Sequence, residues 1–113
     1  MSGFRMTKQT ELVLRELLQN PTRAHYGLAI GQAVDLQSGT IQPILARLER
    51  AGILESFWED PDEHAASIPP RPRRRYYQFT TDGAQQARTA LALATAKRRK
   101  PAKPGTALKP ATD

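Results

Sequence analysis

The sequence contains no cysteine, and this absence excludes several kinds of site at once. Without thiols the chain has no disulfide framework, no thiolate zinc site and no cysteine nucleophile. Apolar runs are also short, and none approaches the roughly 20 residues that a membrane-spanning helix needs. The N-terminus lacks the apolar stretch of a signal peptide. We therefore expect a cytoplasmic protein.

Histidine is scarce as well, since His25 and His64 are the only two in the sequence. Neither has a convincing nucleophile beside it, so we do not expect an enzyme. The run EDPDEH, residues 59–64, gathers carboxylates next to His64, but its spacing matches no calcium loop and it lacks the loop glycine. We expect neither a metal nor a cofactor, and we interpret His25 as a capping or packing residue.

The formal net charge of +6 is concentrated at one end of the chain. Residues 97–113 hold six Lys or Arg and one Asp, a net charge of +5, whereas residues 1–96 hold eleven basic and ten acidic groups. The alternating Pro, Lys, Ala and Gly of the end segment cannot bury enough apolar surface to order itself. A chain of 113 residues supports one domain, which we predict over residues 1–96, followed by a basic disordered tail at 97–113.

Three segments in the first half have the period of helices. Residues 7–20 place Leu14 and Leu17 on one side, and Thr7 can act as the N-cap. Residues 25–34 predict a shorter helix with two glycines, which lower helix propensity and favour close packing against a neighbour.

The third segment, SGTIQPILARLERAG, contains a proline near its start. Its apolar side consists of Ile41, Ile44, Leu45 and Leu48. Gly52 follows in the position where helices commonly end. First-turn amides have no partner inside a helix, so a residue without an N–H is tolerated there. Pro43 therefore predicts that the helix begins near Gly39 or Thr40, with Ser38 or Thr40 as its cap and an N-terminus open to solvent or a partner.

The second half predicts a β-hairpin and a final helix. Residues 53–60 and 74–80 are rich in β-branched and aromatic residues and flank a loop with four prolines. A helix of alanine and leucine follows, from about residue 82 to Lys100. Its narrow apolar seam consists of Ala84, Ala87, Leu91 and Ala94.

Helix, short helix, turn, helix and hairpin follow one another in the order of a winged helix-turn-helix. The expected fold class is mainly α with a small β-hairpin, plus a C-terminal helix. The motifs HYGLAIGQAV, SGTIQPILARLERAGIL and, after a tryptophan, PRRRYYQFTTDG resemble the PadR family of winged-helix transcriptional regulators over about Thr7 to Ala96. The sequence departs from the family pattern in having Gln42 for a tyrosine, no glycine and an extra arginine in the wing, and a shorter C-terminal region.

The resemblance implies a sequence-specific DNA-binding regulator, a repressor that binds a palindromic operator as a homodimer and is associated with the nucleoid. The final helix would then serve dimerisation. The predicted dimer interface consists of Phe4, Met6, Ala84, Ala87, Leu91 and Ala94. Related regulators bind aromatic effectors, but no feature of this sequence supports a small-molecule effector, and that question stays open.

In such a fold the third helix enters the major groove. The predicted DNA contacts are Ser38, Gly39, Thr40, Gln42, Pro43 and Arg47 on the helix, and Arg71, Arg73, Arg74, Arg75 and Tyr76 on the hairpin. Hydroxyls and free helix amides suit phosphate, a glutamine can pair with adenine, and Arg47 can reach phosphate or guanine. The arginines, kept extended by prolines, can follow a DNA backbone or enter a minor groove.

Each of these assignments has a plainer alternative. The hydroxyls can simply cap the helix, Gln42 can be an ordinary exposed glutamine, and the arginines can form a solvated loop balanced by the acidic run. Trp58 is interpreted as a core or interface residue. For the whole chain, the alternatives are an architectural or excision-type DNA-binding factor of a mobile element and a winged-helix protein-interaction module.

Overall fold

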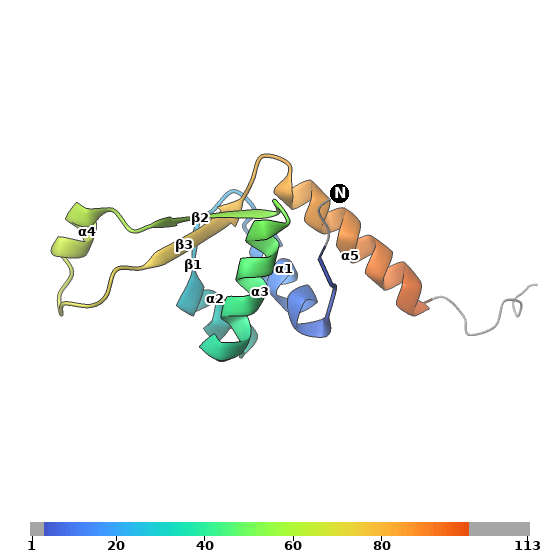
Figure 1. The fold of residues 1–113 in the computed structure, drawn as a ribbon, viewed down its shortest axis with the longest axis horizontal. Helices are drawn as coiled ribbons and strands as arrows, with labels where there is room; N and C mark the ends of the chain where they lie inside the picture. The colour runs from blue at the N-terminus through green and yellow to red at the C-terminus, as the bar shows by residue number, and fades with distance from the viewer. Residues whose placement is uncertain (1–3, 100–113) are drawn as a thin grey trace, which may run out of the picture.

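The computed structural model describes residues 4–99 and contains a three-stranded antiparallel sheet with the order β1-β3-β2. Its elements, in chain order, are α1 (Lys8–Leu18), β1 (His25–Tyr26), α2 (Gly27–Val34), α3 (Ser38–Arg50), β2 (Leu54–Trp58), α4 (Pro61–Ala65), β3 (Arg75–Phe79) and α5 (Gly83–Arg99). The hairpin and α5 extend from the body in opposite directions (Figure 1). Within residues 4–99, no helix has the length and hydropathy to cross a membrane.

The first helix forms as its sequence predicts. The Thr7 side chain accepts a hydrogen bond from the amide of Thr10 at 3.1 Å, so it caps α1. One side of α1 is buried, with Val13, Leu14 and Leu17 fully inaccessible to solvent. The amphipathic period therefore identified the side that packs into the core.

The predicted helix at residues 25–34 begins two residues later than expected. His25 and Tyr26 form the short strand β1, which pairs with Tyr77 and Tyr76 of β3, and α2 starts at Gly27. The glycines do serve close packing. A Cβ on Gly27 would lie 3.2 Å from the Tyr77 ring, and one on Gly31 only 2.8 Å from the Leu36 carbonyl oxygen.

The start of α3 also differs from the prediction. The helix begins at Ser38, its N-cap is Gln37 with no side-chain hydrogen bond, and neither Ser38 nor Thr40 is the cap. Pro43 lies inside the helix, where it lacks the amide that would donate to the carbonyl of Gly39. That carbonyl belongs to an exposed turn, where water can take the place of the missing amide.

The end of α3 agrees with the prediction. Gly52 has a φ of 81° and its amide donates to the Glu49 carbonyl at 3.0 Å. The amide of Ile53 reaches back to the Leu48 carbonyl at 3.0 Å. This pair of bonds is a Schellman motif, which needs the left-handed backbone that glycine adopts readily.

Strands β2 and β3 pair from Leu54 opposite Phe79 to Trp58 opposite Arg75, which confirms the hairpin. Its loop contains the short helix α4, which the sequence reading missed. Asp60 caps α4 by accepting from the amides of Asp62 and Glu63 at 2.7 and 3.3 Å, and Pro61 follows it directly. An aspartate, a proline and two acidic residues in succession are a helix-start signal that was available in the sequence.

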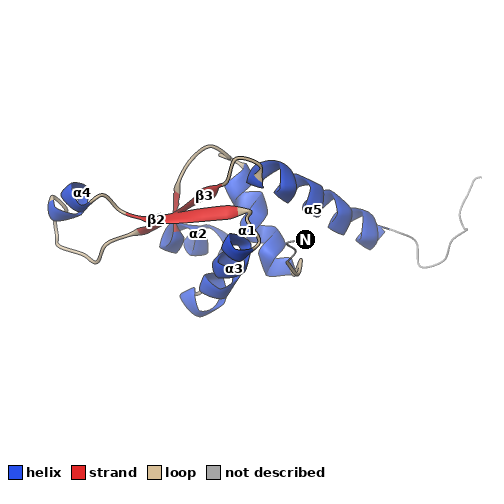
Figure 2. Ribbon diagram, turned by 45° about the horizontal axis from the view of Figure 1, so that its top comes forward, coloured by secondary structure: helices blue, strands red, loops and turns tan. Residues whose placement is uncertain are grey.

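One apolar core joins α1, α2 and α3 to one face of the sheet and to α5 (Figure 2). Ala87 and Leu91 are 0% and 6% exposed, so this side of α5 packs against its own domain. Ala84 also packs partly buried against this core. The predicted seam on α5 is therefore largely an internal contact, because small residues at this spacing allow the helix to approach the body. The predicted tail at 97–113 begins inside α5, and from residue 100 it lies outside the described residues.

Candidate nucleic-acid interface

The N-terminal turns of α3 form an exposed polar surface. Ile41 and Ile44 are buried at 1% and 3% exposure and fix the orientation of the helix. The residues that consequently face solvent are Ser38, Gly39, Thr40, Gln42 and Pro43, and Arg47 follows with partial exposure. The N-cap Gln37 makes no side-chain hydrogen bond to the first turn, and its carbonyl accepts from the amides of Thr40 and Ile41, so the amides of Ser38 and Gly39 remain suited to an anion.

The hairpin, residues 54–79, presents a second surface, which we call the wing. Side chains alternate between the two faces of a strand, so Ser56 and Trp58 share one face, and Arg75 lies opposite Trp58. The guanidinium carbon of Arg75 lies 4.8 Å from the centre of the Trp58 ring, and that of Arg73 lies 5.8 Å away. Trp58 is 52% exposed, so this pair of cation–π contacts lies at the surface.

The two surfaces meet. A cavity of about 270 Å³ is lined by Ser38 and Gln42 from α3 and by Trp58, Arg73 and Arg75 from the wing. The structure thus brings together two helix residues and two arginines that the sequence analysis assigned to DNA contacts. It adds Trp58, whose place opposite Arg75 follows only from the register of the hairpin.

The other predicted wing residues have partners within the chain. Arg71 donates from Nη1 and Nη2 to the two carboxylate oxygens of Glu59 at 2.7 and 2.5 Å. This hydrogen-bonded pair lowers the pKa of Glu59 from 4.5 to about 2, although burial of the carboxylate acts in the opposite direction. The same pairing raises the pKa of Arg71. The charge of Arg71 is therefore balanced locally.

Arg74 and Tyr76 belong to the opposite face of the sheet. The Arg74 guanidinium carbon lies 4.7 Å from the centre of the Tyr26 ring. Tyr76 is half-buried between Tyr26 and Phe57, with ring centres 6.1 and 5.7 Å away. Tyr77 is 6% exposed, which confirms that one of the two adjacent tyrosines packs inward.

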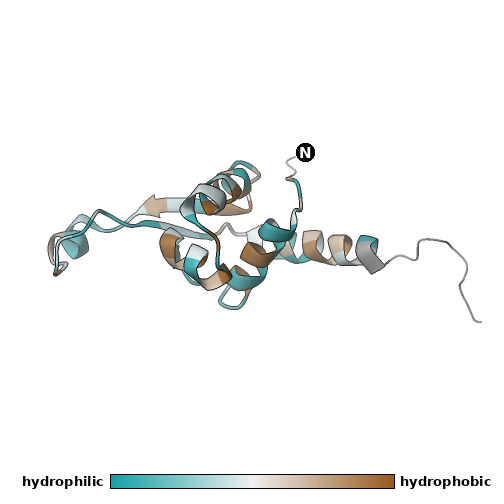
Figure 3. Cartoon of the chain, turned by 90° about the horizontal axis from the view of Figure 1, so that it is seen from below, coloured by the Kyte–Doolittle hydropathy of each residue, from teal (hydrophilic) through white to brown (hydrophobic). Residues whose placement is uncertain are grey.

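The wing is electrostatically divided along its length. Its stem carries the four arginines, whereas α4 at the tip has Asp60, Asp62 and Glu63, all exposed. Figure 3 shows this arm as predominantly hydrophilic. An acidic tip is repelled by phosphates, so a polyanion would be attracted to the stem. No group of three or more potential metal ligands occurs within residues 4–99, and His64 instead contacts the carbonyl oxygen of Arg71.

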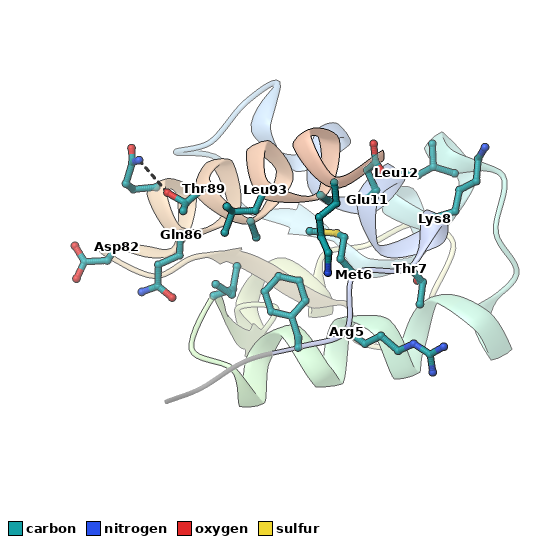
Figure 4. A pocket seen from close by; sticks show the side chains of 16 residues that line it. Arg5, Met6, Thr7, Lys8, Glu11, Leu12, Asp82, Gln86, Thr89 and Leu93 are labelled. Carbon is teal, nitrogen blue, oxygen red and sulfur yellow. Dashed lines mark hydrogen bonds between the residues drawn. The ribbon is translucent and has the colours of Figure 1, made fainter. Parts of the chain in front are cut away.

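A separate groove of about 1320 Å³ lies between the N-terminal segment, α1 and α5 (Figure 4). Of the residues predicted at a dimer interface, it contains Phe4, Met6 and Ala94. It also contains Leu12 and Leu93, which are 41% and 63% exposed and were not predicted. Leu12 directly precedes the buried Val13, and Leu93 follows the buried Leu91 by two residues. A helical period of 3.6 residues turns both leucines away from the core, so the sequence contained the signal that would have found them.

Comparison with known proteins gives a consistent result. The family model described as the transcriptional regulator PadR-like family matches residues 13–89. No curated protein matches the chain. Among solved structures, overoxidized AbfR bound to DNA is similar with a TM-score of 0.62 and 25% identity, over 84% of this chain and 61% of AbfR.

Two further structures show the same similarity. The PcaV transcriptional regulator from Streptomyces coelicolor has a TM-score of 0.60 and 25% identity, over 86% of this chain and 62% of PcaV. A probable transcriptional regulator from Pseudomonas aeruginosa has a TM-score of 0.64 and 19% identity, over 88% of this chain and 66% of that one. This chain thus spans about three fifths of the length of AbfR and PcaV.

Proposed function

The chain belongs to the PadR-like family of transcriptional regulators, and from this premise we propose that it is a sequence-specific DNA-binding repressor that binds a palindromic operator as a homodimer. The family is one of regulators rather than enzymes. The observation that supports this proposal most strongly is that the exposed start of α3 lines the same surface cavity as Arg73 and Arg75. Two elements with complementary roles in duplex recognition therefore face the same side.

The helix supplies the sequence readout in this proposal. α3 lies in the major groove, where the side-chain amide of Gln42 donates to N7 of adenine and accepts from the N6 amino group of the same base. The amides of Ser38 and Gly39 and the Ser38 hydroxyl bind a phosphate at the groove edge. Arg47, one turn further along, binds phosphate or guanine.

The wing supplies phosphate contacts. Arg73 and Arg75 remain next to α3, whereas Arg71 is neutralised by Glu59, so the first two are the stronger candidates for contact with the DNA backbone. The acidic α4 is held away from the duplex by repulsion. In this arrangement the wing binds DNA by its stem rather than by its tip.

A second copy completes the proposed repressor. Its α5 occupies the groove beside Leu12 and Leu93, whose exposed apolar side chains it covers. Phe4, Met6 and Ala94 belong to the same surface. Two copies related by a two-fold axis would present two α3 helices to successive major grooves, and a two-fold symmetric protein matches a palindromic site. Bound across a promoter, the dimer would block transcription and associate the protein with the nucleoid.

Selection from a library of randomised DNA duplexes tests this function. The full chain is expected to enrich a two-fold symmetric consensus with half-sites about one helical turn apart, and to bind it as two copies per duplex. Failure to enrich any sequence, with affinity for DNA weaker than micromolar at low salt, would contradict the proposal and favour a protein-interaction module.

Two variants of α5 test the dimer in the same assay. Leu93→Glu introduces a charge into the apolar groove and is expected to reduce the stoichiometry to one copy per duplex, with loss of affinity. Ala92→Glu changes the adjacent exposed residue, which belongs to a different groove, and should retain two copies. If Leu93→Glu and Ala92→Glu bind with the same stoichiometry and affinity, the groove that contains Leu93 is not the dimer interface.

A further inference from the structure

A hydrogen-bonded chain links the wing to α3. Arg75 of β3 donates from Nη2 to the Oγ of Ser56 on β2 at 2.8 Å. The same hydroxyl donates to Oε2 of Glu49 on α3 at 2.7 Å. Ser56 is half-buried, and both bonds involve an ionised partner, which makes them stronger than bonds between neutral groups.

We propose that Ser56 is a positioning residue for DNA recognition, which fixes the Arg75 guanidinium relative to the recognition helix α3. The inference rests on the proposed function and deepens it. Arg75 is held at two points, by the Ser56 hydroxyl and by the Trp58 ring 4.8 Å from its guanidinium carbon. A guanidinium held in place before binding loses less conformational entropy when it meets a phosphate or base.

The intervening hydroxyl has a consequence that a direct ion pair would not have. Within residues 4–99 Glu49 and Arg75 form no salt bridge, so the Glu49 carboxylate does not use any N–H donor of the Arg75 guanidinium. Only Nη2 of Arg75 is bonded to a side chain in this part of the chain. A guanidinium carries five N–H donors, and those on Nε and Nη1 therefore remain for DNA. Serine anchors Arg75 while preserving its ability to bind an anion.

The location of Arg75 explains why anchoring would affect sequence discrimination. Arg75 lines the same cavity as Gln42, the residue proposed to read bases. Glu49 belongs to the same helix as Gln42, so the Ser56 link joins the wing contact and the base contact into one rigid unit. When that link is lost, Arg75 can still reach phosphates, but it no longer fixes how deeply α3 enters the groove.

The test compares hairpin variants on the selected duplex and on a scrambled duplex of equal length and composition. Ser56→Ala is expected to reduce the ratio of the two affinities about tenfold, the change that corresponds to one charge-assisted hydrogen bond. The slope of log affinity against log salt should stay unchanged, because all charges are retained. Arg75→Ala should reduce this slope by about 1. Ser56→Thr, which retains the hydroxyl, should restore the ratio.

Gln78→Ala is the matched control. It removes a cross-strand bond of 2.9 Å between Gln78 and Glu55, which lies one residue along the same hairpin and on the opposite face. This variant should discriminate between the duplexes as the wild type does. Glu49→Ala breaks the chain from the helix side, so it should reproduce the loss if Ser56→Ala does not fold.

The outcomes separate the two proposals. A wild-type chain that binds both duplexes equally would contradict the proposed function and the role of Ser56 with it. A discriminating wild type with an unchanged ratio in Ser56→Ala and Glu49→Ala would overturn the positioning role alone. An equal loss in Gln78→Ala, or no recovery in Ser56→Thr, would also overturn it, because the effect would then reflect a weakened hairpin.

Discussion

Glu59 is the most extensively paired side chain of the wing. Its carboxylate accepts from both terminal nitrogens of Arg71 and from the amide of Arg74, and it is 3% exposed. Its backbone carbonyl accepts from Arg73 at 3.0 Å. This one acidic residue therefore bonds Arg71, Arg73 and Arg74 at the base of the loop, and its burial is tolerable because the charge is paired.

The sequence predicted only part of this arrangement. Balance by the acidic run as a group was the plainer alternative to DNA contact, but periodicity and composition cannot tell which carboxylate pairs with which guanidinium between residues twelve positions apart. The assignment of all four arginines to DNA treated them as equivalent. Their separation into Arg73 and Arg75 beside α3, Arg74 over Tyr26 and Arg71 on Glu59 depends on strand register, which the sequence left undetermined.

The pKa of Glu59 can be tested by an NMR titration of its carboxyl carbon. In the wild type this carbon should titrate with a pKa of about 2, because Arg71 stabilises the ionised form. In Arg71→Gln the pKa should rise toward 4.5, whereas Arg73→Gln should leave it near 2, since Arg73 bonds to the backbone of Glu59 and not to the carboxylate. A wild-type pKa close to 4.5 would contradict the ion pair.

The same shift fixes the sign of the pH dependence of stability. The folded-state pKa of Glu59 lies below its ordinary value of 4.5, so the folded chain binds fewer protons at this group than the unfolded chain. The stabilisation is complete above pH 4.5 and is lost as the pH falls toward 2.

At the scale of elements, the long periodic segments were predictable and the short ones were not. The helices α1 and α3, the β2–β3 hairpin and α5 have enough residues for a period to emerge. The strand β1 has two residues, and tertiary pairing with β3 decides its conformation. α4 has five residues and is set by its cap, and the start of α3 moved because an internal proline was tolerated in an exposed turn.

Two glycines give a prediction at this scale. A Cβ on Gly31 would meet the Leu36 carbonyl oxygen at 2.8 Å, so Gly31→Ala should destabilise the α2–α3 packing by about 1–3 kcal/mol. A Cβ on Gly39 would meet nothing within 4 Å, so Gly39→Ala should retain stability or gain up to about 1 kcal/mol, since alanine favours helix more than glycine does. Thermal unfolding measures both changes.

DNA binding gives Gly39 a second readout. If a phosphate approaches the backbone of α3 at this residue, Gly39→Ala should bind the selected duplex more weakly despite its stability. Unchanged affinity in a stable Gly39→Ala protein would remove Gly39 from the proposed contacts.

At the scale of the whole molecule, charge and apolar surface are separated. The start of α3 and the stem of the wing face one cavity, and the apolar groove between α1 and α5 is a different site formed by different elements. The sequence predicted DNA contacts at the first of these surfaces and part of a dimer interface at the second. Three of its six predicted dimer contacts, Ala84, Ala87 and Leu91, lie instead on the seam of α5 that packs internally. One amphipathic pattern cannot distinguish a side that faces its own core from a side that would face a second copy.

The central claim is that the exposed start of α3 reads DNA sequence, and the affinity ratio of Gln42→Ala between the selected and scrambled duplexes tests it most directly. A bidentate glutamine–adenine pair contributes about 1–3 kcal/mol of discrimination, so this ratio should fall about 5- to 150-fold, while the circular dichroism spectrum stays unchanged. Gln9→Ala, which alters an exposed glutamine on α1, should match the wild type. A Gln42→Ala protein that folds normally and discriminates as well as the wild type would contradict the account.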